Sequence, residues 1–192
     1  MRLALVIGCS ANVWAEVEEA YWFGHKFDTI YCVKLAGVHF NDAHFDGPRH
    51  FKWVTLHPEF MDDYEAQRAQ NGLHNDYEII APPNNEVGTH GNKGNIARRV
   101  SYRYPGMDAS ASSGGYAAKI ALDDGHDRVV LAGVPMDAEA SHFTRGKPWL
   151  QRDSFTIGFN KSIPHFAGRV RSMSGWSKEQ LGEPTASWLA LS

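Results

Sequence analysis

The chain has 192 residues, which is enough for one well-buried core and short for two full domains. Hydrophobic residues make up 43% and charged residues 21%, an ordinary balance that excludes extensive disorder, a collagen-like chain and a membrane bundle. The net charge of -3 provides no broad positive surface, so we expect no binding to duplex nucleic acid. We therefore expect one domain over residues 1–192.

Membrane and redox features are sparse. No apolar run reaches the length of a membrane span, and the opening MRLALVIG turns polar too soon for a signal peptide. We therefore expect a cytoplasmic protein without a membrane span.

Cys9 and Cys32 lie at or beside the ends of predicted buried strands. A role as small apolar core residues explains them better than a disulfide or a metal site.

The first half of the chain alternates apolar runs with helical patterns. Four runs are typical of buried strands: Leu3–Ile7, Thr29–Val33, Phe51–Leu56 and Tyr77–Ala81. Helical patterns begin at Val13 and span roughly Phe60–Gln70, with Pro58 suited to a first turn. Gly8 has no glycine partner within the next several residues, so the dinucleotide fingerprint is missing and an NAD site is not expected.

Residues 84–104 show no clear period and contain several glycines and basic residues. Long segments of this kind in compact domains are often functional, so we predict a loop or lid that covers a substrate. An ordinary solvated excursion is the alternative. The glycines here do not form a Walker loop, because the required spacing and the Lys-Ser/Thr ending are missing.

The most informative stretch runs from Ser110 to His142. Ser112–Gly115 lead into an apolar helical pattern from Tyr116, and the β-branched run Val129–Ala132 then ends on Gly133. A helix N-terminus presents unpaired backbone N–H groups and a partial positive charge, so Ser112–Gly115 form a candidate seat for a phosphate. The alternative is that the serines only cap the helix and the glycines only permit tight turns.

The sequence after His142 also fits an α/β protein. We predict a helix over Pro148–Ile163, a last strand over Arg169–Met173 and a docking helix in the tail, residues 176–192. The fold class is therefore α/β, a single Rossmann-like domain with a mainly parallel sheet and helices on both faces. Ligands of such folds bind at the carboxyl ends of the strands.

Histidines are frequent, and they raise the question of a metal. The chain has ten, and four of them fall within a short span: His39, His44, His50 and His57. None forms a helical i, i+4 pair around a glutamate, and no cysteine joins them. We therefore expect no metal site.

Two histidines have positions suited to acid–base chemistry. His57 follows the third apolar run and lies at the carboxyl end of a predicted strand. His142 follows the loop 135–141, close in sequence to the ligand edge of the sheet. A neutral imidazole there can accept a proton from an attacking hydroxyl. For His142 the alternative is a side chain that only hydrogen-bonds its own loop.

The central stretch resembles a known family. Its order of Ser-Gly loop, Ala-rich helix, glycine and apolar strand ending on glycine is similar to that of the bacterial lipooligosaccharide sialyltransferases of glycosyltransferase family 42. It also resembles sialyltransferase-like proteins of unassigned function in bacteria and phages. In the family, a Thr-Ser-Gly loop and a Ser-Gly strand end line the pocket for a CMP-sugar. The matching positions here are Ser112, Ser113, Gly114, Ala132 and Gly133.

Two further segments carry the resemblance, which covers about half of the chain. The first turn, which runs from Gly8 through Ser10 to Asn12, resembles the family's Gly-Asn-Gly-Pro-Ser loop. Residues 56–59, Leu-His-Pro-Glu, resemble its Tyr-Asn-Pro-Ser segment, in which the asparagine contacts the donor.

The sequence also departs from the family. The asparagine of the second strand is replaced by Lys34 or Val33, and the donor-binding asparagine of the third strand by His57. The tyrosine that steadies the leaving phosphate would fall on Asp137, whose charge repels a phosphate. The family's catalytic histidine lies further downstream than His142. The resemblance therefore supports the fold more strongly than the activity.

The resemblance implies a sugar-nucleotide-dependent glycosyltransferase that needs neither a metal nor a cofactor. A CMP-sugar is the favoured donor, and the acceptor is a glycan or another hydroxyl compound. His142, or failing that His57, would remove the proton of the acceptor. Lys93, Arg98 or Arg145 would counter the charge of the departing phosphate.

Two other functions stay open. The first is a non-catalytic nucleotide-binding or structural protein, phage-encoded, that kept the fold and lost the chemistry; the missing tyrosine and asparagine motivate it. The second is a glycan-recognising module that stacks sugars on Trp14, Trp22 or Trp149, although their helical spacing favours core positions. The sequence also leaves open whether the chain forms a homo-oligomer.

Overall fold

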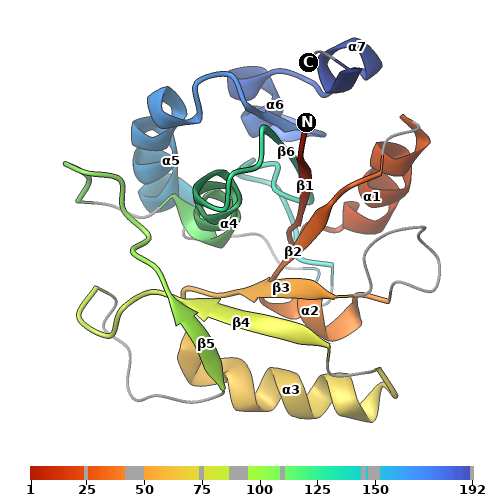
Figure 1. Cartoon of the computed structure of the whole chain (residues 1–192), viewed down its shortest axis with the longest axis vertical. Helices are drawn as coiled ribbons and strands as arrows, with labels where there is room; N and C mark the ends of the chain where they lie inside the picture. The colour runs from red at the N-terminus through yellow and green to blue at the C-terminus, as the bar shows by residue number, and fades with distance from the viewer. Residues whose placement is uncertain are drawn as a thin grey trace.

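The computed structural model describes residues 1–23, 26–41, 50–73, 76–86, 95–108, 111–143, 146 and 152–190. They form one α/β domain around a seven-stranded parallel sheet with the strand order β5-β4-β3-β2-β1-β6-β7 (Figure 1). The strands are β1 Leu3–Ile7, β2 Thr29–Val33, β3 Phe51–Val54, β4 Tyr77–Ala81, β5 Ile96–Arg99, β6 Arg128–Ala132 and β7 Val170–Ser172. The expected fold class is confirmed, and the sheet is parallel throughout.

Helices cover both faces of the sheet. They are α1 Val13–Trp22, α2 Leu35–His39, α3 Met61–Gln70, α4 Ser112–Asp123, α5 Arg152–Phe166, α6 Gly175–Leu181 and α7 Ala186–Ala190, with a 3₁₀ turn, η2, over Pro58–Phe60. Figure 1 shows α2 and α3 together on one side of the sheet and α4 beside α5 on the other. This arrangement is that of a doubly wound sheet.

The apolar strands are buried on both faces, as their continuous runs indicate. In β1, Leu3, Leu5 and Ile7 belong to the core under α1, α2 and α3, whereas Ala4 and Val6 belong to the core under α4 and α5. All five residues are at most 5% exposed. Alternate side chains of a strand point to opposite faces, so one run of apolar residues supplies two cores.

The topology defines where a ligand is expected. The chain moves outward from β1 through β2, β3 and β4 to β5, returns through α4 to β6 on the other side of β1, and then adds β7 beside β6. The order therefore reverses between β1 and β6. In open α/β sheets, ligands bind outside the carboxyl ends of the strands at such a switch point.

Two elements differ from the sequence prediction. Helix α2 follows β2 directly and has only five residues, so it showed no helical period of its own. Strand β5 lies inside the segment 84–104 that was predicted to be a loop; as an edge strand, it is apolar at Ile96 and Ala97 and charged at Arg98 and Arg99. Residues 87–94 of the predicted lid, which include Lys93, lie outside the described residues.

The tail forms two helices where one was predicted. Gly182 has φ 87°, a backbone conformation that favours glycine, and Pro184 follows two residues later. These residues separate α6 from α7. The second helix carries Trp188 and Leu189, which are 7% and 0% exposed and belong to the core.

A charged cluster ties the end of α4 to three strands. The carboxylate of Asp124 accepts hydrogen bonds from the Tyr31 hydroxyl at 2.7 Å, Lys52 Nζ at 2.6 Å and Arg98 Nη1 at 2.7 Å. Burial by itself raises the pKa of Asp124, but the hydrogen bonds from Arg98, Lys52 and Tyr31 outweigh burial and hold it well below its usual range.

This cluster corrects one prediction. Arg98 is paired with Asp124, which precedes β6, and Lys52 is the second residue of β3, so the cluster lies near the amino ends of these strands. Arg98 is therefore not placed to counter the charge of a phosphate at the carboxyl ends. It belongs to the framework of the fold.

We expect Asp124→Asn to lower the free energy of unfolding by about 2 kcal/mol at neutral pH, because Lys52 and Arg98 lose their counter-charge. Since the pKa of Asp124 is lower in the folded state, its contribution is present above the unfolded pKa and is lost as pH falls through the folded one. The difference between wild type and variant should be constant from about pH 7 to pH 5 and should shrink below about pH 4.

Urea denaturation at several pH values measures this difference. Glu18→Gln, which removes one charge at an exposed position of α1, is the control and should have little effect. A constant deficit of the Asp124 variant down to pH 3 would contradict the role of the ionised carboxylate.

Candidate functional site

The carboxyl ends of β1, β2, β3 and β6, together with the start of α4, hold the residues that the sequence singled out. Gly8, Ser10 and Asn12 follow β1, Lys34 follows β2, and His57 comes shortly after β3. Gly133 and Asp137 follow β6, and Ser112, Ser113 and Gly114 begin α4. The sheet thus brings the predicted segments to one edge, which we call the carboxyl edge.

Three of the predicted glycines are explained by packing at the centre of this edge. A Cβ atom on Gly8 would overlap the carbonyl oxygen of Gly133 and lie 2.7 Å from Val134 Cγ2. A Cβ on Gly114 would lie 2.6 Å from Val134 Cγ1, and one on Gly133, at φ 71°, would lie 2.5 Å from Val13. The side chain of Val134 therefore fills the space between Gly8 and Gly114. These glycines are required for the close approach of protein segments.

A buried carboxylate completes this centre. Glu16 of α1 is 7% exposed, and its Oε2 accepts a hydrogen bond from the backbone N–H of Gly133 at 2.7 Å. Its Oε1 accepts one from the hydroxyl of Ser174, just after β7, at 2.7 Å. Burial raises the pKa of Glu16, and the two hydrogen bonds oppose this shift. Sequence reasoning missed this residue because nothing in its spacing separates it from Glu18 and Glu19.

His142 lies directly beside the first turn. It forms an isolated antiparallel bridge with Ser10, and the neighbouring backbone bonds join Ala11 N to Ser141 O at 2.9 Å and Phe143 N to Cys9 O at 3.0 Å. The hydroxyl oxygen of Ser10 is buried and has no hydrogen-bond partner in the described part of the chain. The structure therefore brings two of the predicted site residues together.

The aromatic ring of Phe143 anchors the segment that carries His142. Phe143 stacks on the His142 ring at 5.1 Å between centroids and packs edge-on against Trp14 at 5.8 Å and His39 at 5.4 Å. Trp14 is partly buried, and Trp22 is 81% exposed, which corrects the expectation that both lie in the core. Trp149 lies outside the described residues.

Lys34 has a strained backbone. Its φ of 48° and ψ of -121° are rarely adopted by residues with a side chain. Its N–H donates to Val54 O at 3.1 Å, and its carbonyl accepts from Trp53 Nε1 at 2.6 Å and from Gly37 N at 3.1 Å. Gly37 leaves room for the Trp53 indole, which a Cβ atom would overlap. The surrounding contacts thus hold Lys34 in this conformation.

Strain recurs along the same edge. Among the described residues other than glycine, positive φ angles occur at Lys34, Ser112 with 69°, Met136 with 60° and Ala167 with 50°. The first three belong to the carboxyl edge, at the end of β2, the start of α4 and the loop after β6. Such conformations cluster at functional sites.

The start of α4 matches the predicted anion seat. Ser112–Gly115 form the first turn of this helix, and the N–H groups at the start of a helix lack backbone acceptors within it. Ser112 Oγ accepts a weak hydrogen bond from Gly115 N at 3.4 Å. Ser113 is 6% exposed, and its hydroxyl has no hydrogen-bond partner among the described residues. This turn therefore offers backbone donors and a hydroxyl.

Two further predicted residues have partners that define their roles. Asp137 Oδ1 accepts a hydrogen bond from Trp176 N at 2.7 Å and thereby caps the start of α6. His57 Nδ1 lies 3.0 Å from Glu59 Oε1. Glu59 was not predicted, although the pair is local in sequence. Asn12 is exposed and precedes α1.

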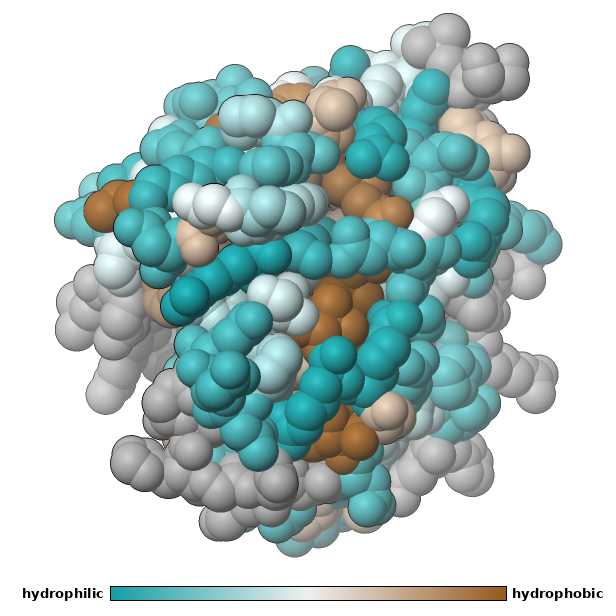
Figure 2. All heavy atoms as spheres, turned by 60° about the vertical axis from the view of Figure 1, so that its left-hand side comes forward, coloured by the Kyte–Doolittle hydropathy of each residue, from teal (hydrophilic) through white to brown (hydrophobic). Residues whose placement is uncertain are grey.

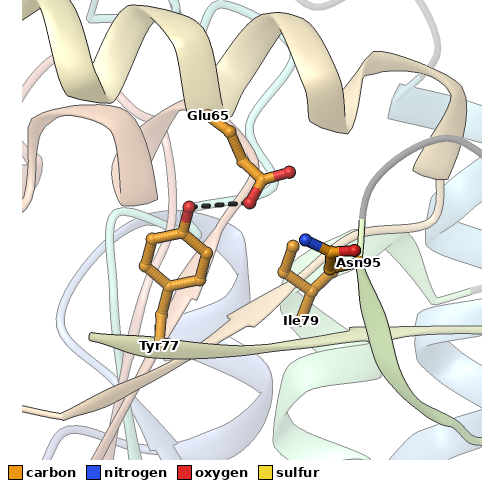
Figure 3. A pocket seen from close by; sticks show the side chains of 4 residues that line it. All are labelled: Glu65, Tyr77, Ile79 and Asn95. Atoms are coloured by element: carbon orange, nitrogen blue, oxygen red, sulfur yellow. Dashed lines mark hydrogen bonds between the residues drawn. The ribbon is translucent and has the colours of Figure 1, made fainter. Parts of the chain in front are cut away.

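A small pocket lies away from this edge. Its volume is about 220 Å³, and it is lined by Glu65, Tyr77, Ile79 and Asn95 between α3 and the strands β4 and β5 (Figure 3). The Tyr77 hydroxyl donates to Glu65 at 2.8 Å across it. Tyr77 begins β4 and Asn95 precedes β5, so this pocket lies at the amino ends of these strands.

The described residues show neither a metal-binding cluster nor a helix suited to a membrane. Within the described ranges, no group of three histidine, cysteine or acidic side chains is arranged to hold a metal ion; His44 lies outside these ranges. In the same ranges no helix has the length and apolar character needed to span a membrane. On the face in Figure 2, hydrophobic side chains lie in furrows between hydrophilic ones.

Comparisons with protein families, curated proteins and solved structures gave no match. The likeness to family 42 glycosyltransferases therefore stays a prediction.

We expect Glu16→Ala to lower the free energy of unfolding by about 2 kcal/mol at pH 7, because the buried N–H of Gly133 loses its acceptor. Glu16→Gln keeps both contacts, since its amide oxygen accepts from Gly133 and its amide nitrogen donates to Ser174. The raised pKa means that ionisation of Glu16 weakens folding as pH rises above its unfolded value. Glu16→Gln should therefore be at least as stable as wild type at pH 7, and this advantage should vanish below about pH 4.

Chemical denaturation of the two variants at both pH values tests this expectation. Glu18→Ala, at an exposed position of the same helix, is the matched control. If Glu16→Gln were as unstable as Glu16→Ala at pH 7, the negative charge itself would be required and the hydrogen-bonding role would be refuted.

Proposed function

We propose that the carboxyl edge binds a sugar nucleotide and that the protein is a sialyltransferase-like glycosyltransferase, which moves a sugar to an acceptor hydroxyl. The observation that carries the proposal is the clustering of strained residues at this edge, namely Lys34, Ser112 and Met136. Each such conformation costs about 1–3 kcal/mol and persists where the surrounding structure enforces it, often at ligand sites.

Two groups at the edge suit a phosphate. The first turn of α4 offers the N–H groups of a helix N-terminus, and the Ser113 hydroxyl has no hydrogen-bond partner among the described residues; both favour an anion. Lys34, at the end of β2, supplies a positive charge at the same edge. Lys93 and Arg145 lie outside the described residues, and Arg98 is held by Asp124. Lys34 therefore takes the role of counter-charge in this proposal.

The chemistry requires one base. The acceptor oxygen attacks the anomeric carbon while its proton passes to an imidazole nitrogen of His142 or His57. The bond from the anomeric carbon to the phosphate oxygen breaks, and the nucleotide leaves with the electron pair. Both histidines belong to the carboxyl edge, His142 beside Ser10 and His57 after β3.

A second function is favoured by a specific observation. Val134 fills the space between Gly8 and Gly114, and Asp137 caps α6 where the family has a phosphate-binding tyrosine. Both features fit a protein that binds a nucleotide, or serves a structural role, without transferring a sugar. The assay below separates the two functions by turnover.

Thermal melting with CMP, UDP, GDP and CMP-sialic acid tests binding. A ligand at about one hundred times its Kd stabilises the folded state by about 2.7 kcal/mol, which raises Tm by about 5–10 °C for a chain of this size. We expect the cytidine compounds to act most strongly. Turnover of CMP-sialic acid that falls about a hundredfold in His142→Ala or His57→Ala indicates a transferase. Binding without turnover favours the non-catalytic nucleotide-binding function. No response at concentrations well above millimolar contradicts a nucleotide site and favours the structural role.

Variants of Lys34 distinguish the effect of its strained backbone from the effect of its positive charge. Lys34→Gly should match or exceed wild-type stability, by up to about 1 kcal/mol, because glycine adopts this backbone conformation without strain. Lys34→Met keeps the strain and loses the charge, and Lys34→Arg keeps both. We expect ligand-induced shifts in Tm to be lost in the glycine and methionine variants and retained in the arginine variant. Equal ligand shifts in all three variants would refute the role of Lys34.

A further inference from the structure

The carboxylate of Glu59 turns back onto the imidazole of His57. Glu59 Oε1 lies 3.0 Å from His57 Nδ1. A carboxylate without a proton only accepts hydrogen bonds, so Nδ1 carries the hydrogen in this pair. The second ring nitrogen, Nε2, then keeps its lone pair. This tautomer is the one that accepts a proton at Nε2.

The backbone around His57 is fixed on both sides. The N–H of His57 donates to Thr55 Oγ1 at 2.9 Å, and its carbonyl accepts from Phe60 N at 3.2 Å. Pro58 begins the 3₁₀ turn η2 directly after it, with φ set by its ring. The turn positions Glu59 two residues beyond His57, within reach of its ring. The pair is therefore built into the connection between β3 and α3.

Burial distinguishes this pair from an ordinary surface ion pair. The side chain of His57 is 40% exposed, whereas that of Glu59 is 24% exposed. Glu59 Oε2 is buried and has no hydrogen-bond partner in the described part of the chain. Burying an oxygen without a hydrogen-bond partner costs stability. An ordinary surface ion pair contributes too little to offset that cost. An accessible imidazole backed by a partly buried carboxylate is the arrangement that orients a histidine for proton transfer.

The pair also lies beside the other candidate groups. Its strand, β3, is hydrogen-bonded to β2, and the N–H of Lys34 donates to Val54 O at 3.1 Å at the end of β3. Neighbouring parallel strands are about 4.8 Å apart. His57 is thus one strand away from the residue that would hold the phosphate.

We propose that His57 and Glu59 act as a dyad, in which His57 Nε2 takes the proton of the acceptor hydroxyl and Glu59 is the positioning residue. This inference rests on the proposed glycosyl transfer and selects its base. The O–H bond of the acceptor breaks, the proton goes to Nε2, and the oxygen forms the bond to the anomeric carbon. The phosphate leaves with the electrons of the broken glycosidic bond, and the imidazolium is stabilised by Glu59.

The tautomer of His57 is the first readout and does not depend on activity. In protein with ¹⁵N-labelled histidine at about pH 8, NMR should show His57 with Nδ1 protonated and Nε2 unprotonated, assigned by loss of the signal in His57→Asn. Glu59→Gln should give a mixture of tautomers, because an amide can accept from or donate to Nδ1. Glu179→Gln, at an exposed position of α6, should leave the spectrum unchanged.

The tautomer measurement can overturn the dyad by itself. An Nε2-protonated His57 in the wild type, or an unchanged tautomer in Glu59→Gln, refutes the positioning role. A purely structural role for Glu59 would alter the melting temperature of Glu59→Gln without altering the tautomer.

Turnover of CMP-sialic acid with a hydroxyl acceptor is the second readout. Glu59→Gln should lower kcat about tenfold or more with little change in KM, and the double variant His57→Ala/Glu59→Gln should be no slower than His57→Ala. Equal kcat values for wild type and Glu59→Gln refute the dyad in an active enzyme. If the wild type shows no turnover, the proposed function and the proton transfer fail together, while the tautomer still decides whether Glu59 positions His57.

Discussion

The close approach of β1 and β6 beyond their carboxyl ends sets the geometry of the whole edge. Gly8 N donates to Ala132 O at 2.7 Å and Ser10 N donates to Gly133 O at 3.2 Å, so the pairing of the two strands continues into their loops. A side chain on Gly8 would overlap the carbonyl of Gly133. This contact brings α1 against Gly133 and allows Glu16 to reach its N–H group.

The same packing separates a closed centre from a polar rim. At the centre, Val134 fills the space beside Gly8, and the N–H of Gly133 is satisfied by Glu16. At the rim, buried oxygens of Ser10, Glu59 and Ser113 have no hydrogen-bond partner among the described residues. Buried polar groups are normally paired, so these three oxygens are candidates for an outside partner; unpaired buried atoms also occur elsewhere in the described chain, as at Tyr104 and Arg128. What singles out the three at the rim is that they lie on the edge where ligands of open α/β sheets bind.

A feature could be predicted from the sequence when the residues that cause it lie close together in the chain. The strands were predicted well because burial on both faces leaves continuous apolar runs, as in Leu3–Ile7, whereas β5 lacks this signal as an edge strand. Glu16 could not be found, because its partners lie 117 and 158 residues away in the chain. Glu59 lies two residues from His57, so the order His-Pro-Glu after a predicted strand was a usable signal.

Strain and unpaired oxygens are two independent costs that coincide on the rim. Lys34 holds an unfavourable backbone conformation, and Ser113 buries a hydroxyl without a described partner. Each costs about 1–3 kcal/mol, and each is removable by one substitution, glycine at Lys34 or alanine at Ser113, that adds no atoms to the core. A chain selected for stability alone would lose both features. Their joint presence on the edge where the topology reverses is the physical argument that this edge binds a ligand.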